Sequence, residues 1–178
     1  IWFLEARPQF LLLSVVLGIL GTSIAWYDGF FNLGYALLAL VGVLLAHISV
    51  NLLNDYYDYR SGVDLATERT PFSGGSGILK AGLLEPRHVL WLGLACFLLA
   101  VPIGIYFVIV SGWLLLPIVL VGAIYVLFYT PVITRLPLPE FGSALGTGAL
   151  QVLGFYFIQT GEYTLPVIVI SVASLILG

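Results

Sequence analysis

Charged residues are scarce in this chain of 178 residues, and their scarcity excludes an ordinary soluble domain. Asp, Glu, Lys and Arg make up 8% of the sequence and hydrophobic residues 61%, whereas a typical soluble domain is about 25% charged. Apolar runs of the roughly 20 residues needed to cross a hydrocarbon core recur along the whole length. The composition therefore predicts an all-α fold, a polytopic bundle of transmembrane helices.

Cysteine, basic residues and methionine are also rare or missing. The single cysteine, Cys96, excludes an internal disulfide and a multi-cysteine metal site. Six basic residues and a net charge of −3 give no support for a nucleic-acid partner. The chain contains no methionine, starts at Ile1, and stops at Gly178 within an apolar run. We therefore expect one transmembrane domain over 1–178 that is an incomplete segment of a longer protein.

Six apolar runs lie between polar breaks, and they predict six transmembrane helices. The predicted spans are 8–27, 33–56, 87–110, 113–130, 141–159 and 164–178. No cleavable signal peptide is expected, because the first run is long and further spans follow it. Pro102 and Pro117 lie inside two of these spans, and we expect them to bend their helices unless neighbouring helices bind the freed carbonyls.

All six basic residues fall on one side of this predicted topology. They are Arg7, Arg60, Arg69, Lys80, Arg87 and Arg135. The opposite connections, around Asp28, 111–112 and 161–162, contain no Lys or Arg. The positive-inside rule then places the amino terminus and the basic loops in the cytoplasm, in a protein of the cell membrane. For Arg87 the alternative remains that it is a topology signal alone.

A polar stripe continues from the second predicted span into the loop that follows it. At 3.6 residues per turn its members fall on one helical face; they are His47, Asn51, Asn54, Asp55 and Asp58. Lipid contact is unfavourable for such a row, so it should face the bundle interior or a wet cavity, where ionisable residues usually mark a functional site. Two alternatives remain open: solvated carboxylates at a helix end, and His47 as a neutral hydrogen-bonding group between helices.

Oxygen ligands without clustered Cys or His suit a hard cation such as Mg²⁺. The spacing of the acidic groups does not match a calcium-binding EF-hand loop. Mg²⁺ typically takes one or two carboxylates and completes its shell with substrate phosphates. Basic side chains could bind the remaining phosphate oxygens, and the candidates are Arg7, Arg69, Lys80 and Arg135.

Two glycine-containing stretches have simpler interpretations than nucleotide binding. The stretch FSGGSGILK lacks the Lys–Ser/Thr ending of a phosphate-binding P-loop, so we expect a loop there. Gly142, Gly146 and Gly148 in the fifth predicted span are more typical of close helix packing.

Taken together, these motifs resemble the UbiA family of intramembrane prenyltransferases. The resemblance is carried by NDYYDYRSGVD at 54–64 and supported by EARPQ at 5–9, by SGGSGILKAGLL at 73–84, and by FYTP and LPLPEFG after the fourth span. The sequence looks most like the branch that prenylates dihydroxynaphthoate in the biosynthesis of the quinone menaquinone. The resemblance implies about nine helices around a central cavity, an isoprenyl diphosphate and a lipophilic acceptor as substrates, Mg²⁺ as cofactor, and membrane lipid as surroundings.

The resemblance also assigns candidate site residues. Asn54 and Asp58 would lead the Mg²⁺ ligands, with Asp55 in the same motif and Asp64 as its outlying member, although Gly62 stands where relatives commonly carry the third Asp. Asp64 could instead hold a basic loop residue. The family's second Asp-rich motif is expected beyond residue 178. The remaining assignments are a catalytic role for Asp55, Asp58 and Tyr125, and substrate contacts for Arg7, Arg69, Lys80, Asn51 and Tyr129.

Five tyrosines of the sequence can each be interpreted in two ways. Tyr125 and Tyr129 resemble family positions beside the reacting allylic carbon, but both could also be interfacial anchors. Tyr56, Tyr57 and Tyr59 likewise fit either an aromatic belt or a surface that stabilises a cation.

Two other classes of protein remain as alternatives. A CDP-alcohol phosphotransferase also uses an intramembrane Asp-rich motif, but the Ala-Arg step expected after Asp28-Gly29 is missing. A cation transporter could use the acidic stripe, but no inverted repeat is apparent. The sequence leaves the acceptor, the prenyl length and the oligomeric state undetermined.

Overall fold

The regular structure of this chain is helical in every part that the structure describes. The computed structural model describes residues 1–63, 75–132 and 144–176. Its helices are α1 (Trp2–Glu5), α2 (Pro8–Tyr27), α3 (Leu33–Ser61), α5 (Pro86–Ser111), the 3₁₀ turn η1 (Trp113–Leu115), α6 (Leu116–Phe128), the π-helical turn η3 (Leu145–Ala149), α8 (Leu150–Thr160) and α9 (Leu165–Ser174). The predicted site residues Asp64 and Arg69, together with Arg135 and Gly142, lie outside the described residues.

The predicted all-α membrane fold is confirmed. Each of the six predicted spans contains a helical segment at the expected position. Within the described ranges, α2, α3 and α5 have 20, 29 and 26 residues and are long and apolar enough to cross a membrane. The apolar helices Trp113–Phe128 and Leu165–Ser174 are shorter.

Local sequence signals account for the helix ends. Pro8 and Pro86 open α2 and α5, where their missing N–H groups have no helical acceptor to lose. Asn32 caps α3, since its side-chain oxygen accepts a hydrogen bond of 3.1 Å from the Tyr35 N–H. Gly62 ends α3 with a φ of 82°, in the left-handed region that favours glycine.

Pro117 does not bend a helix from within, because α6 begins at Leu116 and Pro117 lies in its first turn. Pro117 therefore lies where the 3₁₀ turn η1 passes into α6, and not in the interior of an α-helix. Pro102 does lie inside α5, which continues from Pro86 to Ser111.

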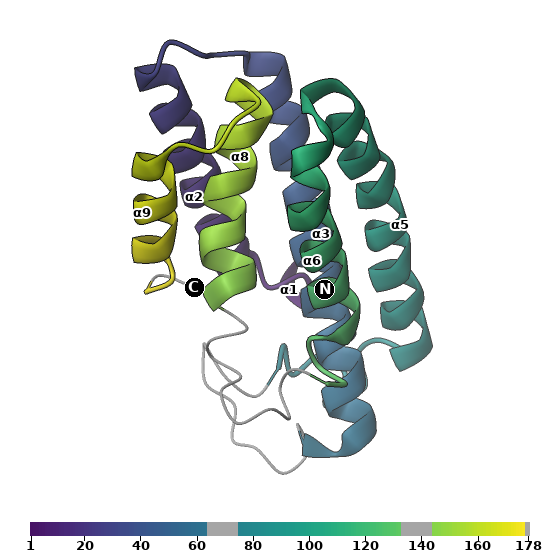
Figure 1. Ribbon diagram of the computed structural model, residues 1–178. Helices are drawn as coiled ribbons and strands as arrows, with labels where there is room; N and C mark the ends of the chain where they lie inside the picture. Colours follow the sequence, from purple (N-terminus) through teal and green to yellow (C-terminus); the bar gives the residue numbers. More distant parts are fainter. Residues whose placement is uncertain (64–74, 133–143, 177–178) are drawn as a thin grey trace.

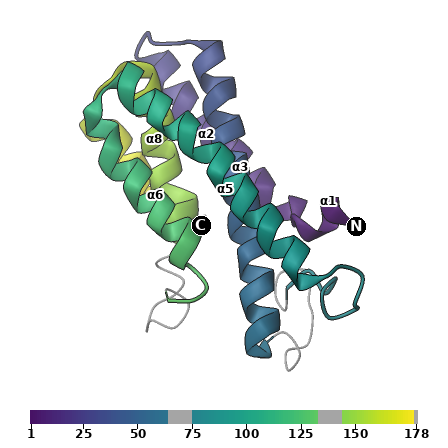
Figure 2. The same cartoon turned by 90° about the vertical axis from the view of Figure 1, so that its right-hand side faces the viewer.

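The connections between helices gather at two opposite ends of the bundle (Figures 1 and 2). The links from α2 to α3, from α5 to α6 and from α8 to α9 lie at one end, whereas α1 and the segment 75–85 lie toward the other. Helix α3 contacts α2, α5, α6 and α8, and its carboxyl-terminal part extends beyond its neighbours at the second end. We call this second end the motif end.

Glycines let the helices of the bundle approach closely. A Cβ at Gly21 of α2 would lie 2.6 Å from the Val152 carbonyl oxygen of α8, and one at Gly148 would lie 2.7 Å from the Ser174 carbonyl oxygen of α9. Both distances are too short for a side chain. The predicted packing role is confirmed for Gly148 and also for Gly146, where a Cβ would lie 2.9 Å from the Tyr125 ring.

Candidate active site

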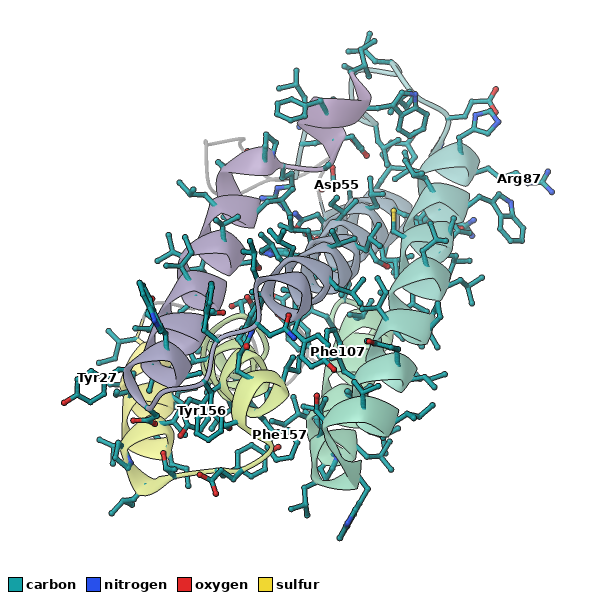
Figure 3. The ribbon with its side chains drawn as sticks, turned by 90° about the horizontal axis from the view of Figure 1, so that it is seen from above. Tyr27, Asp55, Arg87, Phe107, Tyr156 and Phe157 are labelled. Carbon is teal, nitrogen blue, oxygen red and sulfur yellow. The ribbon has the colours of Figure 1, made fainter. Side chains whose placement is uncertain are left out.

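The predicted polar stripe lies on the face of α3 that packs against the rest of the molecule. Asn51 and Asp55 are buried, with 7% and 1% of their surface exposed, and Asn54 and Asp58 are half-buried. In Figure 3 Asp55 lies inside the molecule, whereas Arg87 projects outward at the edge of α5. The stripe is therefore not a row of fully solvated carboxylates.

Asn54 joins three separate parts of the chain. Its side-chain oxygen accepts a hydrogen bond of 3.4 Å from the Arg7 guanidinium. Its amide nitrogen donates to Asp58 Oδ2 at 2.8 Å, one helical turn further on, and to Thr130 Oγ1 at 3.0 Å, just past the end of α6. The amino-terminal segment, α3 and the end of α6 thus meet at this one amide.

Asp55 contacts protein groups on two sides. Its Oδ2 accepts a hydrogen bond of 2.8 Å from the Ser76 N–H, and its Oδ1 lies 3.8 Å from the Arg7 guanidinium. The Ser76 hydroxyl donates to Glu5 Oε2 at 2.6 Å, and Glu5 is fully buried. These contacts join the segment after residue 74 to α1 and α3. Breaking them is costly, because removing one partner leaves a buried charge uncompensated.

Arg7 has a strained backbone that aims its side chain at the stripe. Its φ and ψ are 55° and 62°, and among the described residues it is the one non-glycine with a positive φ. Such a conformation costs on the order of 1 kcal/mol and is concentrated at functional sites. The guanidinium stacks 4.6 Å from the Phe10 ring centroid, and the side chain is only 11% exposed.

Asn51 and Lys80 differ in their surroundings. The Asn51 amide donates to the Ala6 carbonyl oxygen at 2.8 Å, so it holds the residue that precedes Arg7. Lys80 is exposed in the turn that follows the buried Ile78 and Leu79. Of the basic side chains predicted to contact phosphate, Arg7 is therefore the one that the described structure brings into the stripe.

Two side chains of the stripe carry oxygens of the kind that Mg²⁺ binds. Asn54 and Asp58 are half-buried and lie one turn apart; the Asn54 amide nitrogen donates to Asp58, while its oxygen accepts from Arg7. Among the described residues, no group of three or more His, Cys, Asp or Glu side chains could hold a metal ion. An ion here would take two side chains from the described residues and complete its shell with other oxygens, as Mg²⁺ does with substrate phosphates.

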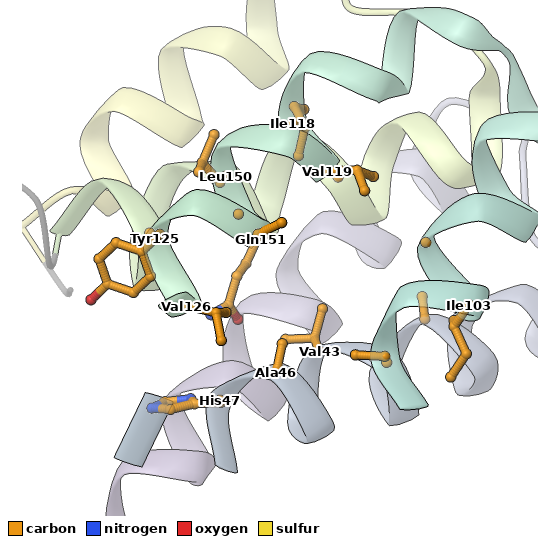
Figure 4. Close-up of a pocket in the computed structure, with 18 of the residues that line it drawn as sticks. Val43, Ala46, His47, Ile103, Ile118, Val119, Tyr125, Val126, Leu150 and Gln151 are labelled. Atoms are coloured by element: carbon orange, nitrogen blue, oxygen red, sulfur yellow. The ribbon is translucent and has the colours of Figure 1, made fainter. Parts of the chain in front are cut away.

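A cavity of about 210 Å³ lies between α3, α5, α6 and α8. Most of its lining is apolar, from Ala39 at one extreme of α3 to Val50 at the other. Four polar side chains line it as well, and they are His47, Tyr125, Thr147 and Gln151. These four lie on the parts of α3, α6, η3 and α8 that are nearest the motif end, where Val50 and Val126 also line the cavity, so the polar groups of the lining lie toward the stripe. Figure 4 shows His47, Tyr125 and Gln151.

The two predicted tyrosines lie together between the stripe and the cavity. Tyr125 and Tyr129 have ring centroids 4.9 Å apart with planes inclined by 43°. Tyr125 is buried and lines the cavity, packed on Gly146, whereas Tyr129 is half-buried and precedes Thr130 of the Asn54 contact. One aromatic pair thus lies next to both regions.

Sequence reasoning missed several residues of this network. The sequence motifs give no role to Glu5, Thr130 or Gln151, and they place Ser76 in a loop. The sequence offers one signal, an acidic residue two positions before Arg7, because a carboxylate at the edge of a membrane span needs a partner. The other residues carry no pattern in the sequence.

Comparisons with known proteins give a consistent result. The family described as the UbiA prenyltransferase family matches residues 11–178. The 1,4-dihydroxy-2-naphthoate octaprenyltransferase of Bacillus subtilis (strain 168) is 34% identical over 174 residues, which are 96% of this chain and 55% of that protein. The protein of the same name from Escherichia coli (strain K12) is 40% identical over 73 residues, 41% of this chain and 24% of that protein. The chain spans about half the length of the Bacillus relative, and no solved structure matches it.

Proposed function

Since this chain belongs to the UbiA prenyltransferase family, we propose that it carries part of the active site of an intramembrane prenyltransferase. The reaction moves an isoprenyl chain from an allylic diphosphate to a lipophilic aromatic acceptor. One observation carries the proposal: a cluster containing Arg7, Asn54 and Asp58 adjoins an apolar cavity through the Tyr125–Tyr129 pair. Such an arrangement suits a substrate with an anionic head and a hydrocarbon tail.

The diphosphate head is bound at the stripe. Asn54 and Asp58 would hold Mg²⁺ through their side-chain oxygens, and Asp64 is a further candidate ligand outside the described residues. When bound, Mg²⁺ supplies the positive charge that lets a diphosphate lie beside carboxylates and leave with the electron pair of the allylic C–O bond. Arg7 donates to phosphate oxygens, as a guanidinium suits them well, and Lys80 and Arg69 add positive charge from the segment after α3.

Asp55 and Asn51 support this site chiefly through other residues. Asp55 holds the Arg7 guanidinium and the Ser76 backbone, and Asn51 holds the carbonyl of Ala6. A fixed Arg7 is needed because donors that are already oriented toward developing charge need no reorganisation during the reaction. The predicted catalytic and metal-binding roles of Asp55 thus become an organising role in this proposal.

The reacting carbon lies beside the two tyrosines. As the C–O bond breaks, the allylic carbon becomes cationic, and the faces of Tyr125 and Tyr129 attract it. The apolar walls of the cavity keep water away until the electron-rich ring of the acceptor attacks. The ring carbon forms a carbon–carbon bond to this cationic carbon, while the diphosphate keeps the electron pair of the broken C–O bond. The ring regains its aromaticity by losing a proton from the attacked carbon, or CO2 if that carbon carries the carboxylate.

The acceptor is proposed from the relatives. Both are named as acting on 1,4-dihydroxy-2-naphthoate, so we propose this compound as acceptor and menaquinone-type quinone biosynthesis as the role. The motif end, where Arg7, Arg60, Lys80 and Arg87 all lie, faces the cytoplasm by the positive-inside rule.

Prenyl transfer by the natural full-length protein in liposomes tests this function. With an allylic diphosphate, 1,4-dihydroxy-2-naphthoate and Mg²⁺, we expect equal amounts of diphosphate and prenylated product. Removal of Mg²⁺ with EDTA should reduce the rate to background, and restored Mg²⁺ should recover it. Cation uptake without product would favour the transporter alternative, and CMP release from a CDP-alcohol would favour the phosphotransferase; either result would overturn the proposal.

A further inference from the structure

The amide of Gln151 lies in the cavity wall, with its oxygen unsatisfied by the described part of the chain. Its Oε1 is buried, and within the described residues it has no hydrogen-bond partner. The side chain extends from α8 into the cavity, toward the wall that carries Ala46 and His47 (Figure 4). A buried carbonyl oxygen without a donor is costly, so its position is explained if a ligand supplies the donor.

His47 offers a second polar group from the opposite wall. Its Nδ1 shares a hydrogen bond of 2.7 Å with the Ser14 hydroxyl of α2, and both residues are buried. This bond fixes the ring, as the partner of one imidazole nitrogen determines what the other can do. Among the described residues Nε2 makes no hydrogen bond, and His47 lines the cavity.

The two substrates differ in which of these groups they can use. An isoprenyl tail has no hydrogen-bond donor, and a diphosphate anion would be repelled by the Gln151 oxygen. A hydroxyl on an aromatic ring matches both side chains, because its O–H can donate to Oε1 while its oxygen accepts from Nε2–H. The flat ring of such a ligand also fits the apolar walls.

We propose that Gln151 and His47 bind a ring hydroxyl of the acceptor and thereby make the enzyme select hydroxylated aromatic rings. The inference rests on the proposed prenyltransferase function. Gln151 contacts the acceptor directly, and Ser14 acts through His47 as a positioning residue. The pair holds the acceptor ring in the cavity next to Tyr125, with the acceptor hydroxyl at the polar part of the lining.

The first experiment uses the unmodified full-length protein in liposomes. Initial rates are measured with 1,4-dihydroxy-2-naphthoate and with each of its two monomethyl ethers, at a fixed allylic diphosphate concentration. Methylation removes the donor at one position, and we expect one ether to show a KM raised on the order of tenfold, the effect of about one hydrogen bond. Equal KM values for the parent compound and both ethers would overturn the inference.

The second experiment uses Gln151→Met, which keeps the length of the side chain and removes its amide. We expect the KM for the acceptor to rise on the order of tenfold, the KM for the allylic diphosphate to stay unchanged, and the discrimination against the ether to disappear. Leu153→Met, on the same helix but outside the cavity lining, is the matched control and should keep both KM values and the discrimination. A Gln151→Met protein that still discriminates against the ether would contradict the assignment.

The two proposals fail in different ways. If the unmodified protein forms no prenylated product with any acceptor, the proposed function is wrong and the inference falls with it. If the protein forms product but uses the ethers as well as the parent compound, the function stands and the roles of Gln151 and His47 are wrong.

Discussion

The two ends of the bundle both carry hydrogen-bonded polar side chains, but they differ in charge and in what the side chains join. At the end opposite the stripe, the Tyr156 hydroxyl donates to Asp28 at 2.7 Å, and the Gln159 side chain makes two hydrogen bonds with the Asn32 backbone. These contacts link α8 to the connection between α2 and α3. No Lys or Arg occurs in the sequence at that end.

At the motif end, an amide side chain contacts both a guanidinium and a carboxylate. Arg7, Asn54 and Asp58 form a chain of contacts, and Asn54 and Asp58 remain half-buried. The far end thus has pairwise contacts without a basic partner that hold helices together, whereas the motif end concentrates charge of both signs. Concentrated opposite charge next to a cavity is typical of a functional site, and pairwise contacts without opposite charge are typical of packing.

Tyr163 makes a contact between uncharged groups at the far end. Its hydroxyl donates to the Leu114 carbonyl oxygen at 3.0 Å, and its ring stacks 4.5 Å from Phe157. Burial raises the pKa of Tyr163 above its ordinary value, so the phenol remains protonated and continues to donate.

The first prediction tests the difference between the two ends by removing one carboxylate from each. Asp58→Ala should lower prenyl transfer at least on the order of 100-fold, because the proposed site loses a metal ligand. Asp28→Ala should leave the rate within about twofold, since the Asp28 carboxylate accepts its hydrogen bond from Tyr156 at the far end. Initial rates in liposomes at saturating Mg²⁺ measure both.

Circular dichroism and thermal unfolding of the two variants control for loss of folding. If Asp58→Ala is folded and retains the full rate, Asp58 has no catalytic role. If Asp28→Ala is folded and loses activity as well, the division between the two ends is wrong.

The second prediction compares two arginines of the motif end whose side chains point in different directions. Arg7→Gln should raise the KM for the allylic diphosphate about 10- to 100-fold, because a charge-assisted contact to phosphate is lost. Arg87 is exposed and projects away from the stripe, so Arg87→Gln should leave the KM unchanged. If both variants raised this KM equally, Arg7 would act only through the overall surface charge, and its proposed contact with the diphosphate would be wrong.

The fold could be predicted from the sequence to the extent that it depends on hydropathy. The predicted spans 8–27 and 87–110 match α2 and α5 closely, because long apolar runs bounded by proline and polar residues define a membrane helix almost alone. Helix α3 instead continues past residue 56 to Ser61, since hydropathy marks where the apolar part ends and Gly62 marks where the helix ends. The π-helical turn at Leu145–Ala149 has no pattern in the sequence.

The site was predictable where its residues belong to one helix. The helical spacing of Asn51, Asn54, Asp55 and Asp58 placed them on one face, and the structure has them there. Spacing could not pair Asp55 with Ser76, or Asn54 with Thr130, because these contacts join residues 21 and 76 positions apart. Nor could it find the unsatisfied Gln151 oxygen, which is defined by the absence of a neighbour in three dimensions.

The smallest expected effect belongs to the far end and concerns stability alone. Tyr156→Phe removes the hydroxyl that donates to Asp28 and accepts a hydrogen bond of 3.2 Å from Thr164. Because a typical intramolecular hydrogen bond contributes about 1 kcal/mol, the free energy of unfolding should fall by about 1–2 kcal/mol, seen as a lower midpoint of thermal unfolding.

The same variant also distinguishes packing from function. Mg²⁺ with an unreactive allylic diphosphate analogue should raise the unfolding midpoint of Tyr156→Phe as much as that of the unmodified protein, because a ligand stabilises by its affinity for the folded state. The analogue should produce no such rise in Asp58→Ala. A loss of ligand-dependent stabilisation in Tyr156→Phe would mean that the far end is coupled to the site through α8, whose first turn carries Gln151 and whose last turns carry Tyr156 and Gln159.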